Sequence, residues 1–211
     1  DPLSLNMTAE SIEANITDRT RAIILVHLFG RPCDIDEVVA IADKHNLVLI
    51  EDCCQTHATK YKGKYVGTFG HMGCFSFQQS KHMTTGDGGM IITNDEDTYI
   101  SLKLFSDKGW DYKYMGDRDH AFLSPNYRMT EMQAAVGKVQ LGRLNQIINE
   151  NKKRYQALEG NIPSSVKTRK FPDGSDPLYD TFIFFTESKD EKERYVRILN
   201  EEGFGTKNLP D

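Results

Sequence analysis

Phe75-Ser-Phe-Gln-Gln-Ser-Lys-His-Met-Thr-Thr-Gly-Asp-Gly-Gly-Met-Ile-Ile-Thr93 is the stretch that decides the fold. It places Lys81 between two apolar runs, 74–77 and 90–93, which we predict to be buried strands. Lysine is rarely buried without a partner, and burial lowers the pKa of its amine and makes it a nucleophile toward a carbonyl. The alternative is a surface hairpin with a solvated lysine, because lysines beside glycine-rich turns are common.

A second apolar run, 47–50, is followed directly by Glu-Asp-Cys-Cys-Gln at 51–55. Asp52 is therefore expected at the carboxyl end of a strand, where ligands bind in open α/β sheets. A carboxylate that holds a pyridinium nitrogen, together with a lysine that forms an imine, is the pairing that a pyridoxal 5′-phosphate (PLP) site needs. The other interpretation of Asp52 is a helix cap or a solvated loop carboxylate.

The bulk composition is that of a globular protein. The chain has 211 residues, enough for one domain and part of another, with 38% hydrophobic and 27% charged residues. Its net charge of −5 gives no attraction to nucleic acid or to anionic membranes, and no run of eighteen apolar residues predicts a membrane span. The four cysteines lack the Cys-x-x-Cys spacing of a metal site, so we expect no metal and reduced thiols in a cytoplasmic protein.

The first fifty residues predict a strand, a helix and a second strand. The run 22–26 shows no alternation, which is typical of a strand covered on both faces, as in a parallel sheet. Asp34 and Glu37 have capping-box spacing and are expected to start a helix over about 35–45. The strand at 47–50 then completes a crossover unit of the kind that joins parallel strands.

A second capping box, Thr130 and Gln133, predicts a long helix over about 131–151. The segment 110–123 before it is polar, aromatic and irregular, and we predict a long loop of functional importance. Further elements are expected as follows: a helix over 9–15 capped by Thr8, a hairpin over 61–65, a helix over 96–106, a loop over 162–177, a strand over 182–185 and a helix over 189–202.

Three motifs in order resemble the DegT/DnrJ/StrS family of sugar aminotransferases: the segment 51–55, the Lys81 stretch and Asn126-Tyr-Arg-Met-Thr-Glu-Met-Gln-Ala-Ala-Val-Gly137. The resemblance runs from about residue 5 to about residue 160. It implies an α/β PLP-transferase fold of the aspartate aminotransferase type, with a mainly parallel central sheet in a large domain at 1–150. Residues 151–211 are then the end of the long helix and part of a smaller α+β C-terminal domain. The family's phosphate loop precedes this segment, so we expect an internal fragment of a longer enzyme.

The resemblance also implies roles for individual residues. Lys81 is the catalytic residue, which forms the imine with PLP and moves the substrate proton. Asp52 pairs with the pyridine nitrogen, and Gln55 approaches the phenolic oxygen of the cofactor. Ser76 binds its phosphate, although serine in a strand is common without any role.

Two further residues follow from the same resemblance. Cys54 lies against the ring where the family usually has alanine, and plain packing is its alternative role. Asn126 reaches the phosphate of the neighbouring subunit, which makes a homodimer with a shared active site obligatory. His27 recurs in the family pattern, but a hydrogen-bonded core histidine explains it equally well. Residues 108–118 are expected to face the substrate.

The implied function is transfer of an amino group, with glutamate as the expected donor, to a keto or aldehyde sugar that is often nucleotide-linked. Such reactions belong to amino-sugar biosynthesis. One alternative is a PLP-dependent sugar dehydratase of the same fold, but that branch has histidine in place of the lysine, whereas this chain has Lys81 followed by His82. The other alternative is a catalytically silent regulatory relative, against which the joint presence of Lys81, Asp52 and Ser76 argues.

Overall fold

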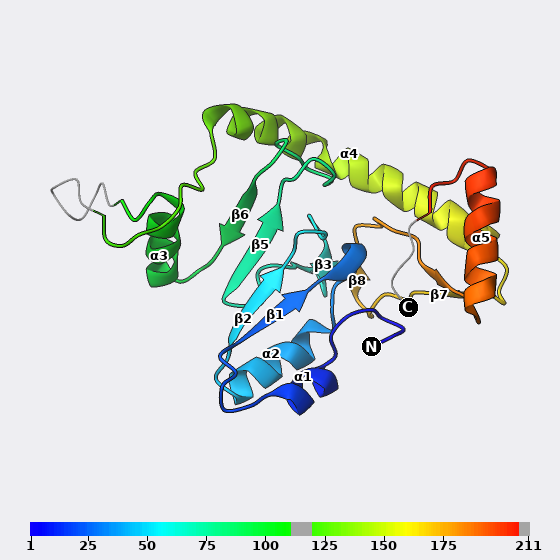
Figure 1. Cartoon of the computed structure of the whole chain (residues 1–211), viewed down its shortest axis with the longest axis horizontal. Coiled ribbons are helices and arrows are strands. Elements are labelled where there is room, and N and C mark those ends of the chain that lie inside the picture. Colours follow the sequence, from blue (N-terminus) through cyan, green and yellow to red (C-terminus); the bar gives the residue numbers. More distant parts are fainter. Residues whose placement is uncertain (111–119, 207–211) are drawn as a thin grey trace.

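A four-stranded sheet forms the centre of the computed structural model, which describes residues 1–110 and 120–206. Its strands lie in the order β1 (Ala22–Val26), β2 (Val48–Asp52), β5 (Met72–Ser76) and β6 (Gly89–Ile92) (Figure 1). β1, β2 and β5 run parallel, and β6 runs antiparallel to β5. The predicted α/β fold with a mainly parallel central sheet is confirmed.

Helices α1 (Ala9–Asn15) and α2 (Ile35–Lys44) cover one face of this sheet. Side chains alternate between the faces of a strand, so every second residue of β1 and β2 points toward these helices. The packed cluster is apolar and contains Ile12, Ile23, Leu25, Cys33, Ile35, Val38, Ile41, Ala42, Leu47, Leu49, Cys53, Tyr61 and Val66. Burial of these side chains is the main stabilising contribution to the N-terminal half.

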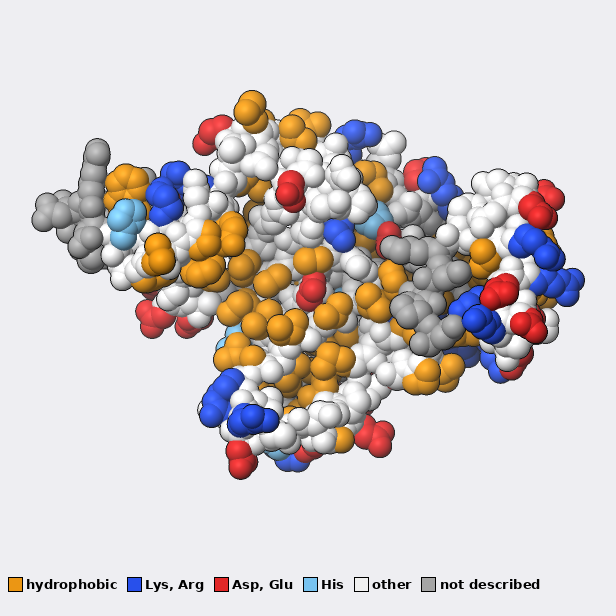
Figure 2. Space-filling view, in the orientation of Figure 1, with side chains coloured by type: hydrophobic (Ala, Val, Ile, Leu, Met, Phe, Trp, Pro, Cys, Tyr) orange, Lys and Arg blue, Asp and Glu red, His pale blue; other side chains and the backbone are white. Residues whose placement is uncertain are grey.

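The opposite face of the sheet is open, which corrects two predictions. The strand at 22–26 is not covered on both faces, because Ile24 is 58% exposed. The strand after the lysine is not buried, because Met90 and Ile91 are exposed. Figure 2 shows hydrophobic side chains gathered over the sheet and toward α3 (Glu96–Ser106). An apolar run reports a preference for burial, but what covers each face depends on packing that the run itself does not encode.

Local capping signals were correct in most places. Thr130 accepts a hydrogen bond from the Gln133 N–H and starts α4 (Glu131–Asn161), as predicted. Asn46, after α2, adopts a left-handed φ of 51°. The predicted Asp34 cap is wrong, since its side chain makes no capping hydrogen bond and its ψ of 80° lies outside the usual N-cap region.

Helix α4 is ten residues longer than its apolar spacing predicts. Its second half carries Tyr155, which is 5% exposed and packs against rings from the following segment. The partners are Phe171, Tyr179 and Phe182, with ring centroids 5.0 to 5.7 Å from that of Tyr155. These aromatic contacts stabilise a polar helical segment whose own pattern is weak.

The C-terminal part is tied back onto the first half. A small sheet joins β3 (Lys60–Tyr61), β4 (Lys64–Tyr65) and β8 (Ser175–Asp176), while β7 (Lys167–Thr168) pairs with β9 (Phe184–Phe185) beside α5 (Lys189–Glu201). The single turn η1 (Leu28–Gly30) follows β1. Because α4 continues through residue 150, the proposed division between 1–150 and 151–211 falls inside a helix and stays a prediction.

Most of the predicted loop 110–123, and most of the predicted substrate-facing segment 108–118, lies outside the described residues. In the two described ranges, no helix combines the length and apolar character needed to cross a bilayer.

Candidate active site at the carboxyl edge of the sheet

Two of the predicted site residues lie where the parallel strands end. Asp52 is the last residue of β2, and Ser76 is the last residue of β5. The register pairs Asp52 with Cys74, two residues before Ser76, so Asp52 and Ser76 lie on the same face of the sheet. This is the open face, opposite α1 and α2, so it is accessible to a ligand.

Cys54 lies two residues after Asp52 and is hydrogen-bonded to it. The Asp52 carboxylate accepts a hydrogen bond from the Cys54 N–H at 3.0 Å. Burial raises the pKa of the Cys54 thiol to about 12, the neighbouring Asp52 carboxylate adds to this rise, and the positive charge of Lys81 opposes it. Cys54 is thus a half-buried thiol beside Asp52, and the charge of Lys81 contributes to its electrostatic environment.

Lys81 lies in the lysine loop, which we define as residues 77–88 between β5 and β6. The Lys81 N–H donates to the Gln78 carbonyl at 2.9 Å, and Lys81 itself is half-buried rather than buried as predicted. Gln133 of α4 donates to the Asp87 carbonyl at 3.0 Å and anchors the loop from above. The backbone can turn here because Gly86 and Gly88 have φ of 84° and 147°, which L side chains rarely adopt.

Gln55 and Ser76 present polar groups beside this loop. The Gln55 side-chain oxygen accepts a hydrogen bond from the Phe29 N–H at 2.8 Å. That bond fixes the orientation of the amide, so its NH2 group is the end available as a donor. The Ser76 hydroxyl accepts from the Gln78 N–H at 3.3 Å, which retains its own O–H for a ligand.

Asn126 is placed elsewhere. It is exposed in the segment between α3 and α4, which projects beyond β6 in Figure 1. Its side-chain oxygen accepts from Arg128 Nε at 3.0 Å, and Arg128 also pairs with Asp107 at 3.2 Å. In the described part of this chain, Asn126 makes no hydrogen bond to Asp52 or Lys81, and its predicted role on a neighbouring subunit stays a prediction.

Glu51, the residue before Asp52, is the centre of a buried polar hub, which consists of Glu51, His27 and the backbone N–H groups that bond to Glu51. Glu51 is fully buried and bonds to His27 Nε2 at 3.2 Å. His27 Nδ1 accepts from the Cys33 N–H at 3.1 Å, so the proton lies on Nε2 and is donated to Glu51. His27 is thus a hydrogen-bonded core histidine. His27, Glu51 and Cys53 lie close enough together to hold a metal ion. The oxygens of Glu51, however, already accept hydrogen bonds from three backbone N–H groups.

The sequence analysis assigned no site role to three ionisable residues in this region, His57, His82 and Asp180. His57 is 3% exposed, lies between the rings of Phe75 and Phe77, and has its pKa lowered to about 4, chiefly by burial. His82 Nε2 pairs with Asp180 Oδ1 at 2.9 Å. His57 could have been noticed because it closely follows Gln55, and His82 because it follows Lys81, but Asp180 carries no local signal.

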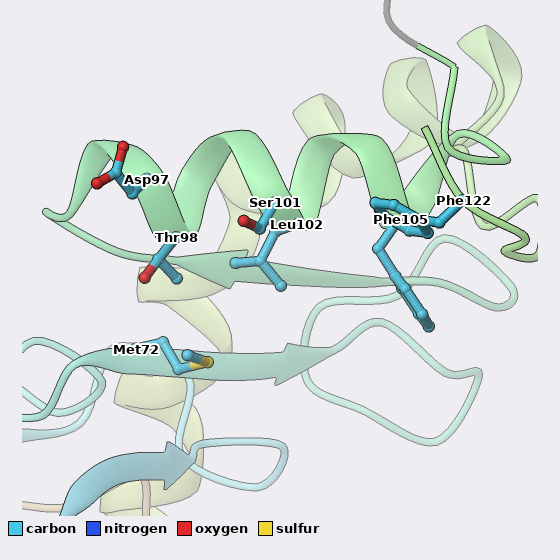
Figure 3. Close-up of a pocket in the computed structure, with 7 residues that line it drawn as sticks. All are labelled: Met72, Asp97, Thr98, Ser101, Leu102, Phe105 and Phe122. Atoms are coloured by element: carbon cyan, nitrogen blue, oxygen red, sulfur yellow. The ribbon is translucent and has the colours of Figure 1, made fainter. Parts of the chain in front are cut away.

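A groove of about 480 Å³ lies outside this site. Figure 3 shows it between α3 and β5, with Leu102 and Phe105 on the helix, Met72 on the strand and Phe122 closing one end. Met72 is the first residue of β5, whereas Ser76 is its last, and none of the predicted site residues lines the groove. We therefore assign the chemistry to the carboxyl edge and not to this groove.

Comparison with known proteins agrees with this arrangement. GDP-perosamine synthase of Escherichia coli O157:H7 is 38% identical over 187 residues, which cover 89% of this chain and 51% of that protein. An aminotransferase from Psychrobacter cryohalolentis superposes with a TM-score of 0.86 at 36% identity, over 96% of this chain and 57% of that one. E. coli GDP-4-keto-6-deoxy-D-mannose-3-dehydratase, solved with bound hydrated PLP, gives a TM-score of 0.81 at 27% identity, over 96% and 57%.

The fold and the lysine between β5 and β6 define the class, which is the PLP aminotransferase fold of type I. More narrowly, the chain belongs to the DegT/DnrJ/EryC1/StrS aminotransferase family, whose sequence model matches residues 1–209. The predicted family is confirmed, and the match extends beyond the expected residue 160. The chain spans about half the length of the relatives described above.

Proposed function

We propose that the protein carrying this chain is a PLP-dependent aminotransferase of amino-sugar biosynthesis. It would move an amino group from glutamate to a keto or aldehyde sugar, often nucleotide-linked. The observation that carries the proposal is the placement of Asp52 and Ser76 at the ends of neighbouring parallel strands, with Lys81 in the loop that follows the second of them, at the carboxyl edge of the sheet. Similarity to GDP-perosamine synthase supports a sugar as the acceptor.

The residues at this edge fit the functional groups of PLP. The cofactor has an aldehyde, a pyridine nitrogen, a phenolic oxygen and a phosphate, and this edge offers an amine, a carboxylate, an amide NH2 and a hydroxyl. Lys81, Asp52, Gln55 and Ser76 supply these groups in that order. The hydrogen bond from Phe29 turns the Gln55 NH2 outward as a donor, which is the polarity that a phenolate requires.

PLP, when bound, supplies an electron sink for the pair of electrons left by the departing substrate proton. Asp52 holds a positive charge on the pyridine nitrogen, because an ionised carboxylate stabilises a nearby cation. Lys81, once its amine is free, would take the proton from the α-carbon of the amino donor and return it to C4′ of the cofactor, the carbon that then carries the amino group. Cys54 stays a neutral thiol, since its pKa is raised to about 12, and packs as a small apolar group.

Reduction with borohydride tests this proposal. We expect the intact protein to absorb near the boundary of the visible and ultraviolet ranges, and the reduced cofactor to be found on the Lys81 peptide by mass spectrometry. Lys81→Ala should abolish the label. Lys167→Ala should retain it, because Lys167 is an exposed lysine outside the site whose side chain pairs with Glu187. A colourless wild-type protein without a labelled Lys81 peptide contradicts the proposal.

Lys81→His separates the transferase from its dehydratase alternative. A dehydratase is expected to retain turnover with histidine at this position, whereas an aminotransferase loses it, since imidazole cannot form the imine. A silent regulatory relative would bind no cofactor in the borohydride experiment. Formation of 2-oxoglutarate from glutamate, with a panel of nucleotide-linked keto sugars, identifies the donor and the acceptor class.

A homodimer with a shared active site forms part of the proposal. Support comes from exposed apolar side chains on the first half of α4, where Met132, Val136 and Val139 are 80%, 47% and 64% exposed. Asn126 lies on the projecting segment directly before this helix. Sedimentation velocity is expected to give a dimer, and mixing Asn126→Ala with Lys81→Ala protein should restore activity in the hybrid dimers through one intact site.

We also place the protein in the cytoplasm. The four cysteines are free thiols, as expected in a reducing compartment. Fractionation of cells that express the tagged protein tests this placement, and recovery in an oxidising compartment with blocked thiols would contradict it.

A further inference from the structure

The turn η1, which follows β1, carries a strained residue. Phe29 has φ of 54° and ψ of 46°, the left-handed region that a bulky side chain rarely adopts. Its N–H donates to the Gln55 side-chain oxygen at 2.8 Å. A residue persists in such a conformation only where the surrounding structure holds it, so the contacts that hold η1 also determine whether the bond to Gln55 forms.

A buried guanidinium from the C-terminal segment holds η1. Arg169 is 5% exposed, and its Nη1 donates to the Leu28 carbonyl at 2.9 Å. Its Nη2 donates to the side-chain oxygen of Asn6 at 3.3 Å. The same Asn6 oxygen accepts from the Leu28 N–H, also at 3.3 Å. Arg169 and Asn6 therefore engage both backbone polar groups of Leu28.

The bonds to Arg169 and to Gln55 share one peptide group. The Leu28 carbonyl and the Phe29 N–H belong to the same planar unit, and no peptide bond in the two described ranges is cis. In a trans peptide these two groups point in opposite directions, so Arg169 binds one side of the unit and Gln55 binds the other. A rotation of the unit away from Gln55 must also break the hydrogen bond to a charged donor, and such bonds are about twice as strong as neutral ones.

The residue after Phe29 is held from the same C-terminal segment. Leu178 is 1% exposed, and its N–H donates to the Gly30 carbonyl at 3.2 Å. Gly30 has φ of 76°, and a Cβ built on it would lie 3.2 Å from the Leu178 Cβ. Glycine at position 30 thus permits the close approach of the two segments, which restrains η1 on both sides of Phe29.

We propose that Arg169 is a positioning residue of the candidate active site, which acts through the Leu28–Phe29 peptide to keep the NH2 group of Gln55 directed toward the cofactor. The inference rests on the proposed function, because the phenolic oxygen of PLP is the group that this NH2 would meet. Without the Phe29 donor, the Gln55 amide is no longer fixed in one orientation, and the reversed amide presents its oxygen to a phenolate, which repels it.

Hydrogen exchange in the intact protein without cofactor tests the inference independently of activity. Arg169→Gln retains a polar atom near the position of Nε, which in the wild type donates to the Ser4 carbonyl at 2.7 Å, but it is too short to reach the Leu28 carbonyl. We expect the Phe29 N–H to exchange about tenfold faster in this variant, as for the loss of a hydrogen bond to a charged group. The interior N–H groups of β1 should retain their wild-type rates.

Arg31→Gln is the matched control. Arg31 is 6% exposed, and its guanidinium donates to the carbonyls of Ser4 and Lys170 but, in the described ranges, to no atom of η1. The Phe29 exchange rate in Arg31→Gln should equal that of the wild type. An equal acceleration in both variants, or an unchanged Phe29 rate in Arg169→Gln, overturns the inference. If Arg169→Gln does not fold, the wild type decides, because a Phe29 N–H that exchanges as fast as in an unfolded chain is not held, whereas slow exchange supports the inference.

A double-variant comparison in the holoenzyme tests the link to Gln55. Arg169→Gln is expected to shift the absorbance maximum of the bound cofactor in the same direction as Gln55→Leu. The double variant should shift it no further than Gln55→Leu alone, because Arg169 acts through Gln55, and fully additive shifts contradict this. Failure of borohydride labelling in the wild type, by contrast, removes the proposed function and leaves the measured effect of Arg169 on Phe29 in place.

Discussion

Replacing Glu51 with glutamine is expected to destabilise the fold strongly, although the two side chains have almost the same shape. Glu51 is 0% exposed. Its Oε2 accepts from the Gly67 N–H at 2.6 Å and from His27 Nε2 at 3.2 Å. Its Oε1 accepts from the N–H groups of Phe69 and Gly70, each at 2.7 Å. Four donors therefore converge on one buried carboxylate.

The magnitude follows from the loss of two of these four hydrogen bonds. An amide has one oxygen and one NH2 group, so in either orientation two donors of the protein face a donor. Hydrogen bonds to a charged group contribute about 1.5 to 3 kcal/mol each, and the loss of two corresponds to about 3 to 6 kcal/mol. His27 cannot adapt by moving its proton, because its Nδ1 accepts from the Cys33 N–H. The change is a large share of a typical stability of about 5 to 15 kcal/mol.

The pH dependence of stability should change in the same variant. Burial raises the pKa of Glu51, but the hydrogen bonds from His27, Gly70 and Gly67 outweigh it and hold the pKa below the ordinary value of 4.5. A carboxyl group with a lowered folded-state pKa stabilises the fold above its unfolded pKa, and this contribution is lost as the pH falls through the folded value. Glu51→Gln should lack this contribution to acid unfolding.

Urea unfolding followed by circular dichroism measures the effect. We expect a lower midpoint with an unchanged slope, since the surface exposed on unfolding stays the same. Glu187→Gln is the control, because Glu187 is exposed and its ion pair with Lys167 at 2.9 Å is solvated. A Glu51→Gln midpoint equal to that of Glu187→Gln would refute the account of the hub.

Three further outcomes are expected. Thr130→Ala should cost about 1 kcal/mol in thermal unfolding, because it removes the side-chain acceptor of the Gln133 N–H at the start of α4, while Thr130→Ser should restore it. Gly73→Ala should prevent proper folding, since the added Cβ would overlap the Gly67 carbonyl. At Gly142 an added Cβ meets nothing within 4 Å, so Gly142→Ala should stabilise α4 by about 1 kcal/mol, which equilibrium unfolding would measure. His57, whose pKa burial lowers to about 4, stays neutral in the fold while the unfolded chain gains a proton below pH 6.5, so stability should fall by about 3 kcal/mol between pH 6.5 and 4. His57→Gln should flatten that part of the urea-midpoint profile, and an unaltered profile would show that His57 is not the group responsible.

Much of the fold and part of the site follow from short segments of sequence. The strands at 22–26 and 48–52 and the start of α4 are close to their predicted positions, because hydrophobic runs and caps act within a few residues. Asp52, Ser76 and Lys81 could be proposed as site residues from the sequence because they lie at the ends of predicted strands or in a glycine-rich turn, and their roles stay predictions. The predicted side-chain cap at Asp34 was wrong, since the spacing of a capping box does not by itself fix the backbone angles of its first residue.

The sequence by itself determined the order of the elements, the family, and the choice of Lys81 and Asp52 as candidate site residues. The tertiary structure alone decided that one face of the sheet is open, that aromatic contacts prolong α4, and that Asp180 meets His82 beside Lys81. The physical reason is one of range. Hydrophobic runs and helix caps depend on neighbours within a turn or two, whereas burial and electrostatic partners depend on which distant segments pack together.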